Sequence, residues 1–207
     1  MKLRGLSSIK LLAKQTLYAR IVLVWIALFC LANAGLNAGE MIDARINIGL
    51  KLFRAILAAD LKIKTKINSN AELPLLLIYK DNINKGKKYA KNLLDLGKKN
   101  GHAQIKNIPI KVSFVHYQFF TSEKNDLPAG IFLLDKMSAE ELAPIISFAI
   151  KNHIIVYSPF DGDIEKDITA GLSIGARVRP IINVKTLNAS QIQIKPFFLK
   201  VAKKYEP

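Results

Sequence analysis

A continuous apolar run at Leu73–Tyr79, with the sequence LPLLLIY, limits the possible folds of this chain more than any other feature. A strand with one face in water alternates apolar and polar residues, whereas a strand covered on both faces is apolar throughout, as in parallel sheets. Three further short apolar runs follow, at residues 108–115, 130–134 and 153–157. Segments with helical spacing lie between them. This alternation predicts an α/β fold: a Rossmann-like layered fold with a mainly parallel sheet and helices on both faces.

The segment 41–59 is predicted to be a helix with two apolar stripes. Leu50 and Phe53 belong to a stripe with spacings of three and four residues, which lies on one helix face. Ile48 and Leu52 belong to a second stripe. We expect a helix that is apolar on two sides to be covered on both, by the sheet and by either another helix or a partner chain. Leu50 and Phe53 are therefore candidate partner-binding residues, for another protein or for a homodimer.

Two more helices are expected between the strands. One is predicted at residues 85–99, and the other follows Ser138. There Ser138 and Glu141 match a capping box, in which each side chain accepts a hydrogen bond from the backbone N–H of the other residue. Pro144 has no backbone N–H, so we expect the second helix either to kink at this residue or to begin late.

The C-terminal part of the chain has a different pattern. Two short extended runs, Ala170–Ile174 and residues 179–184, are predicted to form a β-hairpin added to the sheet. Pro196 suits the first turn of a final helix. The expected buried face of this helix comprises Phe197, Phe198, Val201 and Ala202. Without an internal repeat or linker, residues 35–207 are predicted to form a single domain.

The N-terminal segment has the features of an export signal. Residues 1–20 contain five Lys or Arg and no acidic residue, and the apolar run IVLVWIALFCL follows. The stretch Ala32-Asn33-Ala34 matches a signal-peptidase site, which predicts a signal peptide over residues 1–34. An alternative cleavage site follows Ala38. The run is shorter than the roughly 20 apolar residues that span a bilayer, which favours cleavage over an uncleaved anchor. We therefore expect an exported protein with no stable membrane anchor, and cleavage would remove Cys30, the only cysteine.

The charge of the chain narrows its possible partners. The formal net charge is +15, and the predicted signal carries five cations and no acid, so the exported chain would keep +15 − 5 = +10. In a cytoplasmic protein such an excess would indicate nucleic acid, which is not expected as a partner outside the cytoplasm. The remaining alternatives are an anionic membrane face, an acidic partner protein, an anionic ligand, or simple solvation of exposed lysines.

No set of residues predicts catalysis. The stretch Gly171-Leu-Ser-Ile-Gly175 matches the pattern of a serine-hydrolase nucleophile, but that motif needs a following helix and a later histidine, and the last histidine is His153. The histidines lack metal-ligand spacing, and Asp161-Gly-Asp163 lacks the remaining ligands of a calcium loop. The sequence therefore predicts a protein that is not an enzyme and that has no metal or cofactor.

Three residues of the C-terminal part are predicted to be structural. Gly171 and Gly175 are expected to permit a tight turn or a close approach of backbones. Asn183 lies in an apolar strand, where an amide without partners would cost about 1–3 kcal/mol. We expect its side chain to tie the strand to a neighbouring turn.

The stretch RVRPIINVKTLNASQIQIKPFFLKVA at residues 177–202 resembles the C-terminal signature of the YfiR-like family of bacterial periplasmic proteins. The similar features are a glycine-rich turn and strand, the Ile182-Asn183 pair, a small helix, a short extended piece and a last helix. LKLFRAILAADLKIK, before the first apolar run, resembles one branch of the family. The resemblance spans nearly the whole chain after the signal, although this chain lacks the disulfides of the best-known member.

The resemblance implies a non-catalytic regulator in the periplasm. The best-known family member holds an inner-membrane diguanylate cyclase inactive by binding its periplasmic part, and other members are encoded near sensor kinases or outer-membrane receptors. The expected partner is accordingly the periplasmic part of an inner-membrane cyclase or sensor kinase, in a cyclic-di-GMP or related signalling pathway.

A periplasmic receptor for a small anionic solute is the alternative. In open α/β sheets, ligands bind beyond the carboxyl ends of the strands. The polar and aromatic residues expected at these ends form the candidate ligand site: Lys80, Asp81, Asp135, Lys136, Ser158 and Phe160.

Overall fold

The computed structural model describes residues 39–99, 101–120 and 127–206. The chain divides into two compact units, Met1–Ala44 and Arg45–Pro207. The first unit is helical at its described residues 39–44, and the predicted signal peptide, with either cleavage site, lies outside the described residues. The sheet and the helices that cover it belong to the second unit, which begins later than the predicted domain start at residue 35.

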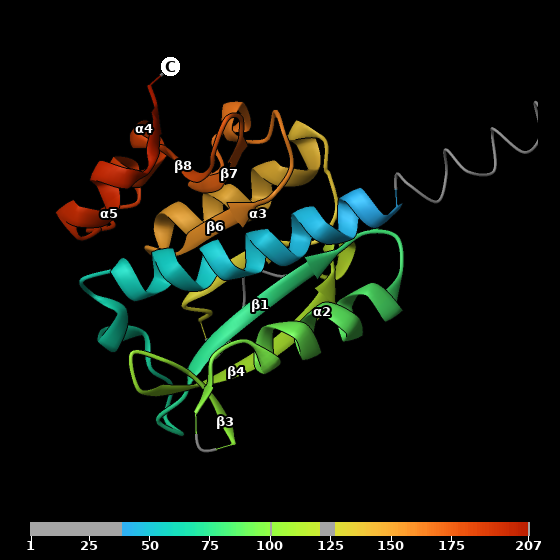
Figure 1. The fold of residues 1–207 in the computed structure, drawn as a ribbon, viewed down its shortest axis with the longest axis vertical. Coiled ribbons are helices and arrows are strands. Elements are labelled where there is room, and N and C mark those ends of the chain that lie inside the picture. The colour runs from blue at the N-terminus through green and yellow to red at the C-terminus, as the bar shows by residue number, and fades with distance from the viewer. Residues whose placement is uncertain (1–38, 100, 121–126, 207) are drawn as a thin grey trace, which may run out of the picture. The chain divides into compact units, whose positions relative to one another are not determined.

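The described strands form one mixed, mostly parallel sheet in the order β2-β3-β4-β1-β5-β6-β7-β8-β9 (Figure 1). Their bounds are β1 Leu73–Tyr79, β2 Lys98–Lys99, β3 His102–Ile105, β4 Ile108–His116, β5 Gly130–Leu133, β6 Ile155–Ser158, β7 Ala170–Ile174, β8 Val178–Asn183 and β9 Lys203–Tyr205. Strands β4, β1, β5, β6 and β7 pair in parallel. Strand β8 returns antiparallel to β7 as a hairpin, and β9 runs parallel to β8. The predicted α/β fold with a mainly parallel sheet is confirmed.

Helices cover both faces of the sheet. Residues 45–59 are helical, and the later helices are α2 Ile83–Asp95, α3 Ala139–Lys151, α4 Val184–Ala189 and α5 Pro196–Val201. Short 3-10 turns occur at η1 Ile63–Lys66, η2 Tyr117–Phe119 and η3 Ile164–Lys166. Helix 45–59 and α2 share one hydrophobic core with Leu75 and Leu77 of β1. Helix α3 shares a second core with Leu76 and Ile78. Successive residues of β1 thus point into different cores, which explains why its sequence is apolar without interruption.

Two helix boundaries differ from those expected. Helix α3 begins directly after Ser138, where both hydrogen bonds of the capping box are present, so of the two alternatives expected for Pro144 the late start is wrong. Helix α2 ends at Asp95, earlier than the predicted end at residue 99. Gly97 follows with a φ of 68°, in the left-handed region that favours glycine, and the chain then turns into the β2–β3 hairpin.

The predicted buried face of the last helix is partly wrong. Phe197 and Val201 are 77 % and 44 % exposed, whereas Phe198, Leu199 and Ala202 are half-buried and pack against the core. Phe197 and Val201 are four residues apart and therefore share a helix face, and the face that carries Phe198 and Ala202 is the one that turns inward. Strand β9 follows α5, so the helix is not the last element of the chain.

The segment between α4 and α5 lies beside the end of helix 45–59. The backbone N–H of Leu61 donates to the oxygen of Gln193 at 2.8 Å, and the N–H of Lys195 donates to the oxygen of Ala59 at 3.0 Å. Asp60 and Ile194 form an isolated antiparallel bridge between these bonds. The end of helix 45–59 and the segment between α4 and α5 therefore close the same part of the core, where Ile192 and Ile194 are buried.

Candidate functional site

The carboxyl ends of β1 and β5 bring together two residues of the predicted ligand site. The backbone N–H of Lys80, after β1, donates to Oδ2 of Asp135, after β5, at 2.8 Å. The Asp135 side chain is buried and also forms an ion pair with Nζ of Lys85 in α2. The carboxylate of Asp135 thus joins two strand ends and a helix, and its charge is neutralised inside the domain.

The side chain of Lys80 is paired as well. Its Nζ lies 2.8 Å from Oε1 of Glu141 at the start of α3. The hydrogen bond between the two groups raises the pKa of the Lys80 ammonium and lowers the pKa of the Glu141 carboxyl, since each stabilises the charged form of the other. Asp81 and Lys136 are exposed on the same edge.

Ser158, the last residue of β6, and Phe160, which follows the strand, belong to another hydrogen-bonded network. The hydroxyl of Ser158 donates to Oδ2 of the fully buried Asp163 at 2.6 Å and accepts from the backbone N–H of Phe160 at 3.2 Å. Lys166 forms an ion pair with Asp163 at 3.0 Å and donates to the backbone oxygen of Met137 at 2.8 Å. These contacts tie the loops after β5 and β6 together, so the side chains of Lys80, Asp135 and Ser158 are all paired with neighbouring groups.

An aromatic cluster beside Lys80 has no counterpart in the sequence prediction. Nε2 of His116 lies 2.8 Å from the backbone oxygen of Lys80. The His116 ring centroid lies 4.9 Å from that of Tyr117 and 5.7 Å from that of Phe119. Phe119 is 73 % exposed. The stretch FVHYQFF at residues 114–120 already places these rings beside His116, and what the sequence did not reveal is the contact of His116 with Lys80.

Leu50 and Phe53 are core residues, which corrects their assignment as partner contacts. Both side chains are fully buried within the chain itself. The Phe53 ring packs edge-on against Phe132, with ring centroids 5.5 Å apart, and contacts Tyr157 at 5.9 Å. A partner could reach neither side chain without opening the domain. The amphipathic spacing identified the correct inward stripe, but that stripe faces the sheet.

Asn183 joins β8 to two neighbouring segments. Its side-chain amide donates to the backbone oxygen of Ile164 in η3 at 3.0 Å, and its oxygen accepts from the N–H of Thr186 at 3.0 Å as the N-cap of α4. The residue is completely buried, so both ends of its amide are satisfied without water.

The two glycines predicted to be structural differ. A Cβ on Gly171 would lie 2.9 Å from the backbone oxygen of Ser158, so glycine permits a close approach of β7 to β6. A Cβ on Gly175 would meet no atom within 4 Å, and this residue is not among those with positive φ. The expectation that Gly175 is required for a tight turn or close approach is therefore wrong.

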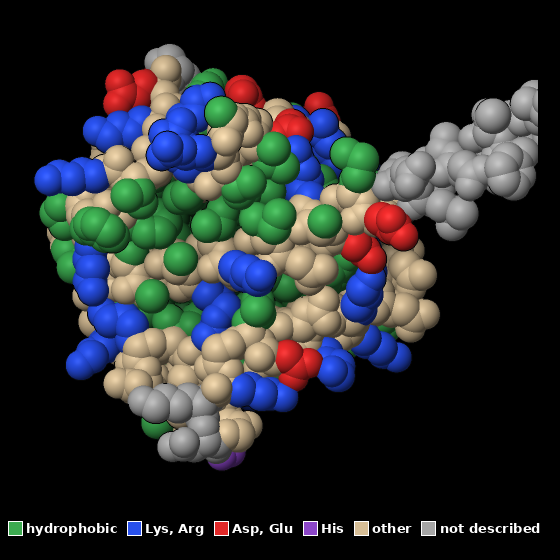
Figure 2. Space-filling view, in the orientation of Figure 1, with side chains coloured by type: hydrophobic (Ala, Val, Ile, Leu, Met, Phe, Trp, Pro, Cys, Tyr) green, Lys and Arg blue, Asp and Glu red, His purple; other side chains and the backbone are tan. Residues whose placement is uncertain are grey.

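Apolar side chains are exposed around the β7–β8 hairpin and α5. Ile174 and Val178 pair with each other at the hairpin tip, and each is about half exposed. Phe197 and Val201 project from α5 as described above. Figure 2 shows hydrophobic side chains gathered over α5, with Lys and Arg side chains beside them. We call the region of the hairpin tip, α5 and the start of β9 the C-terminal surface; it carries these four exposed apolar residues and the cations Arg177, Arg179 and Lys203.

The cations of the C-terminal surface lie around a shallow hollow. The hairpin tip and the start of β9 enclose about 460 Å³, with Arg177, Arg179 and Lys203 in the lining and no acidic side chain. Among the ion pairs of the described residues, none involves these three side chains. This surface therefore combines exposed apolar groups with unpaired positive charge, in contrast to the self-paired carboxyl edge.

Comparisons with protein-family models and with curated proteins found no match. In the described part of the chain, no helix is both long and apolar enough to cross a membrane. The same residues contain no group of three or more His, Cys, Asp or Glu side chains positioned to hold a metal ion.

Proposed function

We propose that this chain is a periplasmic regulatory protein that binds the periplasmic part of an inner-membrane signalling protein, a diguanylate cyclase or a sensor kinase, through its C-terminal surface. The proposal includes cleavage of the N-terminal signal, a Rossmann-like relationship of the fold and membership of the YfiR-like family. The sequence resemblance supports it, and the observation that carries it is the combination of exposed apolar side chains and unpaired cations on one surface.

An acidic partner protein fits this surface better than a second copy of the chain. In a two-fold symmetric dimer the same patch meets itself, which would place Arg177 and Arg179 near the cations of the other copy. Like charges facing each other across an interface cost several kcal/mol. A partner with a central apolar patch and acidic side chains around it would instead bury Phe197 and Val201 and pair the cations. Exposed aromatic residues and arginines are also the residue types enriched where binding energy concentrates.

Regulation would then follow from differential affinity. A protein that binds the inactive form of a sensor more tightly than the active form shifts the population by the ratio of the two affinities. Moving an equilibrium from 1:99 to 99:1 requires a ratio of about 10⁴. No reactive group of the regulator takes part.

The experiment is site-specific crosslinking in cells that produce the full chain. A photoreactive residue replaces Val178, and the captured membrane proteins are identified by mass spectrometry. The paired variant Arg177→Glu/Arg179→Glu is expected to reduce capture about tenfold or more, because both cations become anions facing an acidic surface. The control is Lys87→Glu, at an exposed position of α2. It also changes a cation into an anion, but away from the C-terminal surface, and should leave capture unchanged.

Two results would contradict the proposal. One is a native protein found in the cytoplasm with its leader still attached. The other is capture of the same sensor at equal yield by the double charge-reversal variant, or capture of a second copy alone.

A further inference from the structure

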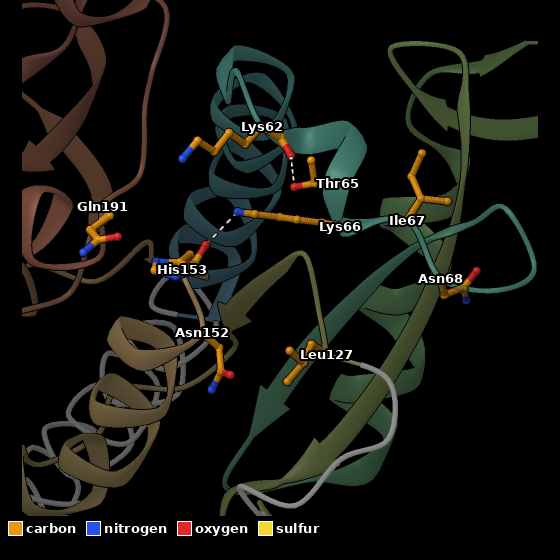
Figure 3. Close-up of a pocket in the computed structure, with 9 residues that line it drawn as sticks. All are labelled: Lys62, Thr65, Lys66, Ile67, Asn68, Leu127, Asn152, His153 and Gln191. Carbon is orange, nitrogen blue, oxygen red and sulfur yellow. Dashed lines mark hydrogen bonds between the residues drawn. The ribbon is translucent and has the colours of Figure 1, made fainter.

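Another cavity lies at the opposite edge of the sheet, near the amino ends of β1, β5 and β6. Its volume is about 400 Å³, within the range of sites that hold small molecules. Figure 3 shows Ile67 and Asn68 on one side, His153 and Gln191 on the other, and Leu127 and Asn152 below them. The lining therefore comes from segments that are far apart in the sequence.

The charged side chains that line this cavity are Lys62 and Lys66, and no acid lines it. Nζ of Lys66 donates to the backbone oxygen of His153 at 2.7 Å and forms an ion pair at 2.8 Å with Asp60, whose side chain is 1 % exposed. These two partners hold the Lys66 ammonium in place, and of the two contacts only that with His153 is a hydrogen bond, so N–H donors of the ammonium remain for a ligand. Because Asp60 neutralises Lys66, the charge of Lys62 is the one that remains uncompensated.

The other lining residues add neutral polar groups and an apolar wall. The amides of Asn152 and Gln191 can donate or accept hydrogen bonds, and the hydroxyl of Thr65, which donates to the backbone oxygen of Lys62 at 2.9 Å, can still accept one. Ile67 and Leu127 supply apolar surface. One uncompensated positive charge, several neutral polar groups and an apolar wall match a small organic molecule with a single negative charge.

The backbone around the cavity has two unusual conformations. His153 and Gln191 have φ angles of 59° and 51°, in the left-handed region that residues other than glycine rarely adopt. Nδ1 of His153 lies 2.9 Å from the backbone oxygen of Ser190, so the two loops support each other in this conformation. Both residues directly follow a helix C-cap, Asn152 of α3 and Ser190 of α4, and their left-handed conformation ends each helix in the usual way. The cavity therefore lies where two helix ends meet, and these ends fix the position of part of its lining.

We propose that this cavity binds a small organic monoanion, with a carboxylate bound by Lys62 and by a remaining N–H of Lys66 and an apolar part against Ile67 and Leu127. The site is distinct from the C-terminal surface and from the carboxyl edge of the sheet. The proposal does not depend on the identity of a partner protein, and it assigns the basic charge near η1 a ligand-binding role.

The test is a titration followed by the backbone amide signals in NMR spectra of the ¹⁵N-labelled protein. The probes are acetate, benzoate and 3-phenylpropionate, each compared with its neutral amide. At least one carboxylate is expected to shift the signals of Lys66, His153 and Gln191 in a saturable way, with a dissociation constant below about 10 mM. The neutral amide derivative of that carboxylate is expected to bind at least about tenfold more weakly, because the charge-assisted hydrogen bonds are lost.

The variant Lys62→Met keeps a long side chain and removes the uncompensated charge. It is expected to weaken binding of the carboxylate about tenfold, whereas Lys64→Met, an exposed neighbour outside the lining, should leave it unchanged. Lys66 is left intact because its removal would strand the buried carboxylate of Asp60. The proposal is overturned if no carboxylate gives saturable shifts around the cavity, if the amides bind equally well, or if Lys62→Met binds like the original protein.

Discussion

Replacing Phe53 by alanine separates a core role from a partner-binding role. The Phe53 side chain is completely buried and contacts the rings of Phe132 and Tyr157. Truncation of a buried Phe to Ala costs about 3–5 kcal/mol, from the lost burial together with the cavity left behind. Native domains are stable by only about 5–15 kcal/mol, so this is a large part of the total. For a domain of this size each kcal/mol lowers the melting temperature by about 2–4 °C, which gives a decrease of about 6–20 °C.

The assay is urea unfolding followed by circular dichroism, supported by a thermal scan. Phe197→Ala is the matched control, because it removes the same atoms from a side chain that is 77 % exposed. We expect that control to change the free energy of unfolding by no more than about 0.5 kcal/mol and to weaken partner capture. A Phe53→Ala variant that loses less than about 1 kcal/mol of stability but fails to capture the partner would refute the assignment of Phe53 to the core.

Three further predictions concern single groups. Gly171→Ala should lower the free energy of unfolding by about 1–3 kcal/mol, because its Cβ would press on a backbone oxygen of β6, whereas Gly175→Ala should be neutral or slightly stabilising in the same urea assay. Tyr157→Phe should leave stability unchanged or raise it, since the buried Tyr157 hydroxyl has no partner among the described residues; a clear loss in a thermal scan would contradict this. Hydrogen bonds from Lys91 and Lys98 lower the pKa of Asp95 from 3.8 to about 2. The contribution of Asp95 to stability is therefore present above pH about 4 and is lost as the pH falls toward 2. Lys98→Met should raise the Asp95 pKa, measured by a carboxyl ¹³C titration. An unchanged pKa would exclude the ion pair between Lys98 and Asp95 as a cause of the lowered value.

The central part of the fold could be predicted from the sequence because its pattern is set by burial. Strand β1 matches the predicted range Leu73–Tyr79, since a strand between two cores must be apolar at every position. Strands β2, β3 and β9 could not be predicted, because they have two to four residues each, are exposed in part and carry no long apolar run. Their extended conformation depends on pairing with a neighbouring strand, which local sequence does not reveal.

The faces of short helices and the sites were harder to predict. In α5 the pairs Phe197/Val201 and Phe198/Ala202 have the same spacing and similar apolar character, so only the packing of the chain decides which pair is exposed. The candidate ligand residues at the strand ends were placed on the correct edge, but the ion pair between Lys85 and Asp135 joins residues 50 positions apart and has no local signal. Lys62 and Gln191, which line the cavity at the amino ends of the strands, are even farther apart in the sequence.

The contact between the end of helix 45–59 and the segment before α5 bears on when this chain can fold. Ile192 and Ile194 complete a core whose other members include Phe53 and Leu57, so this part of the interior stays open until the segment that carries these two isoleucines has been synthesised. Contacts of such long sequence separation slow folding, because the entropy of closing the intervening chain is lost before they form. During synthesis, the inward face of helix 45–59 would therefore wait for a partner segment more than a hundred residues further along the chain.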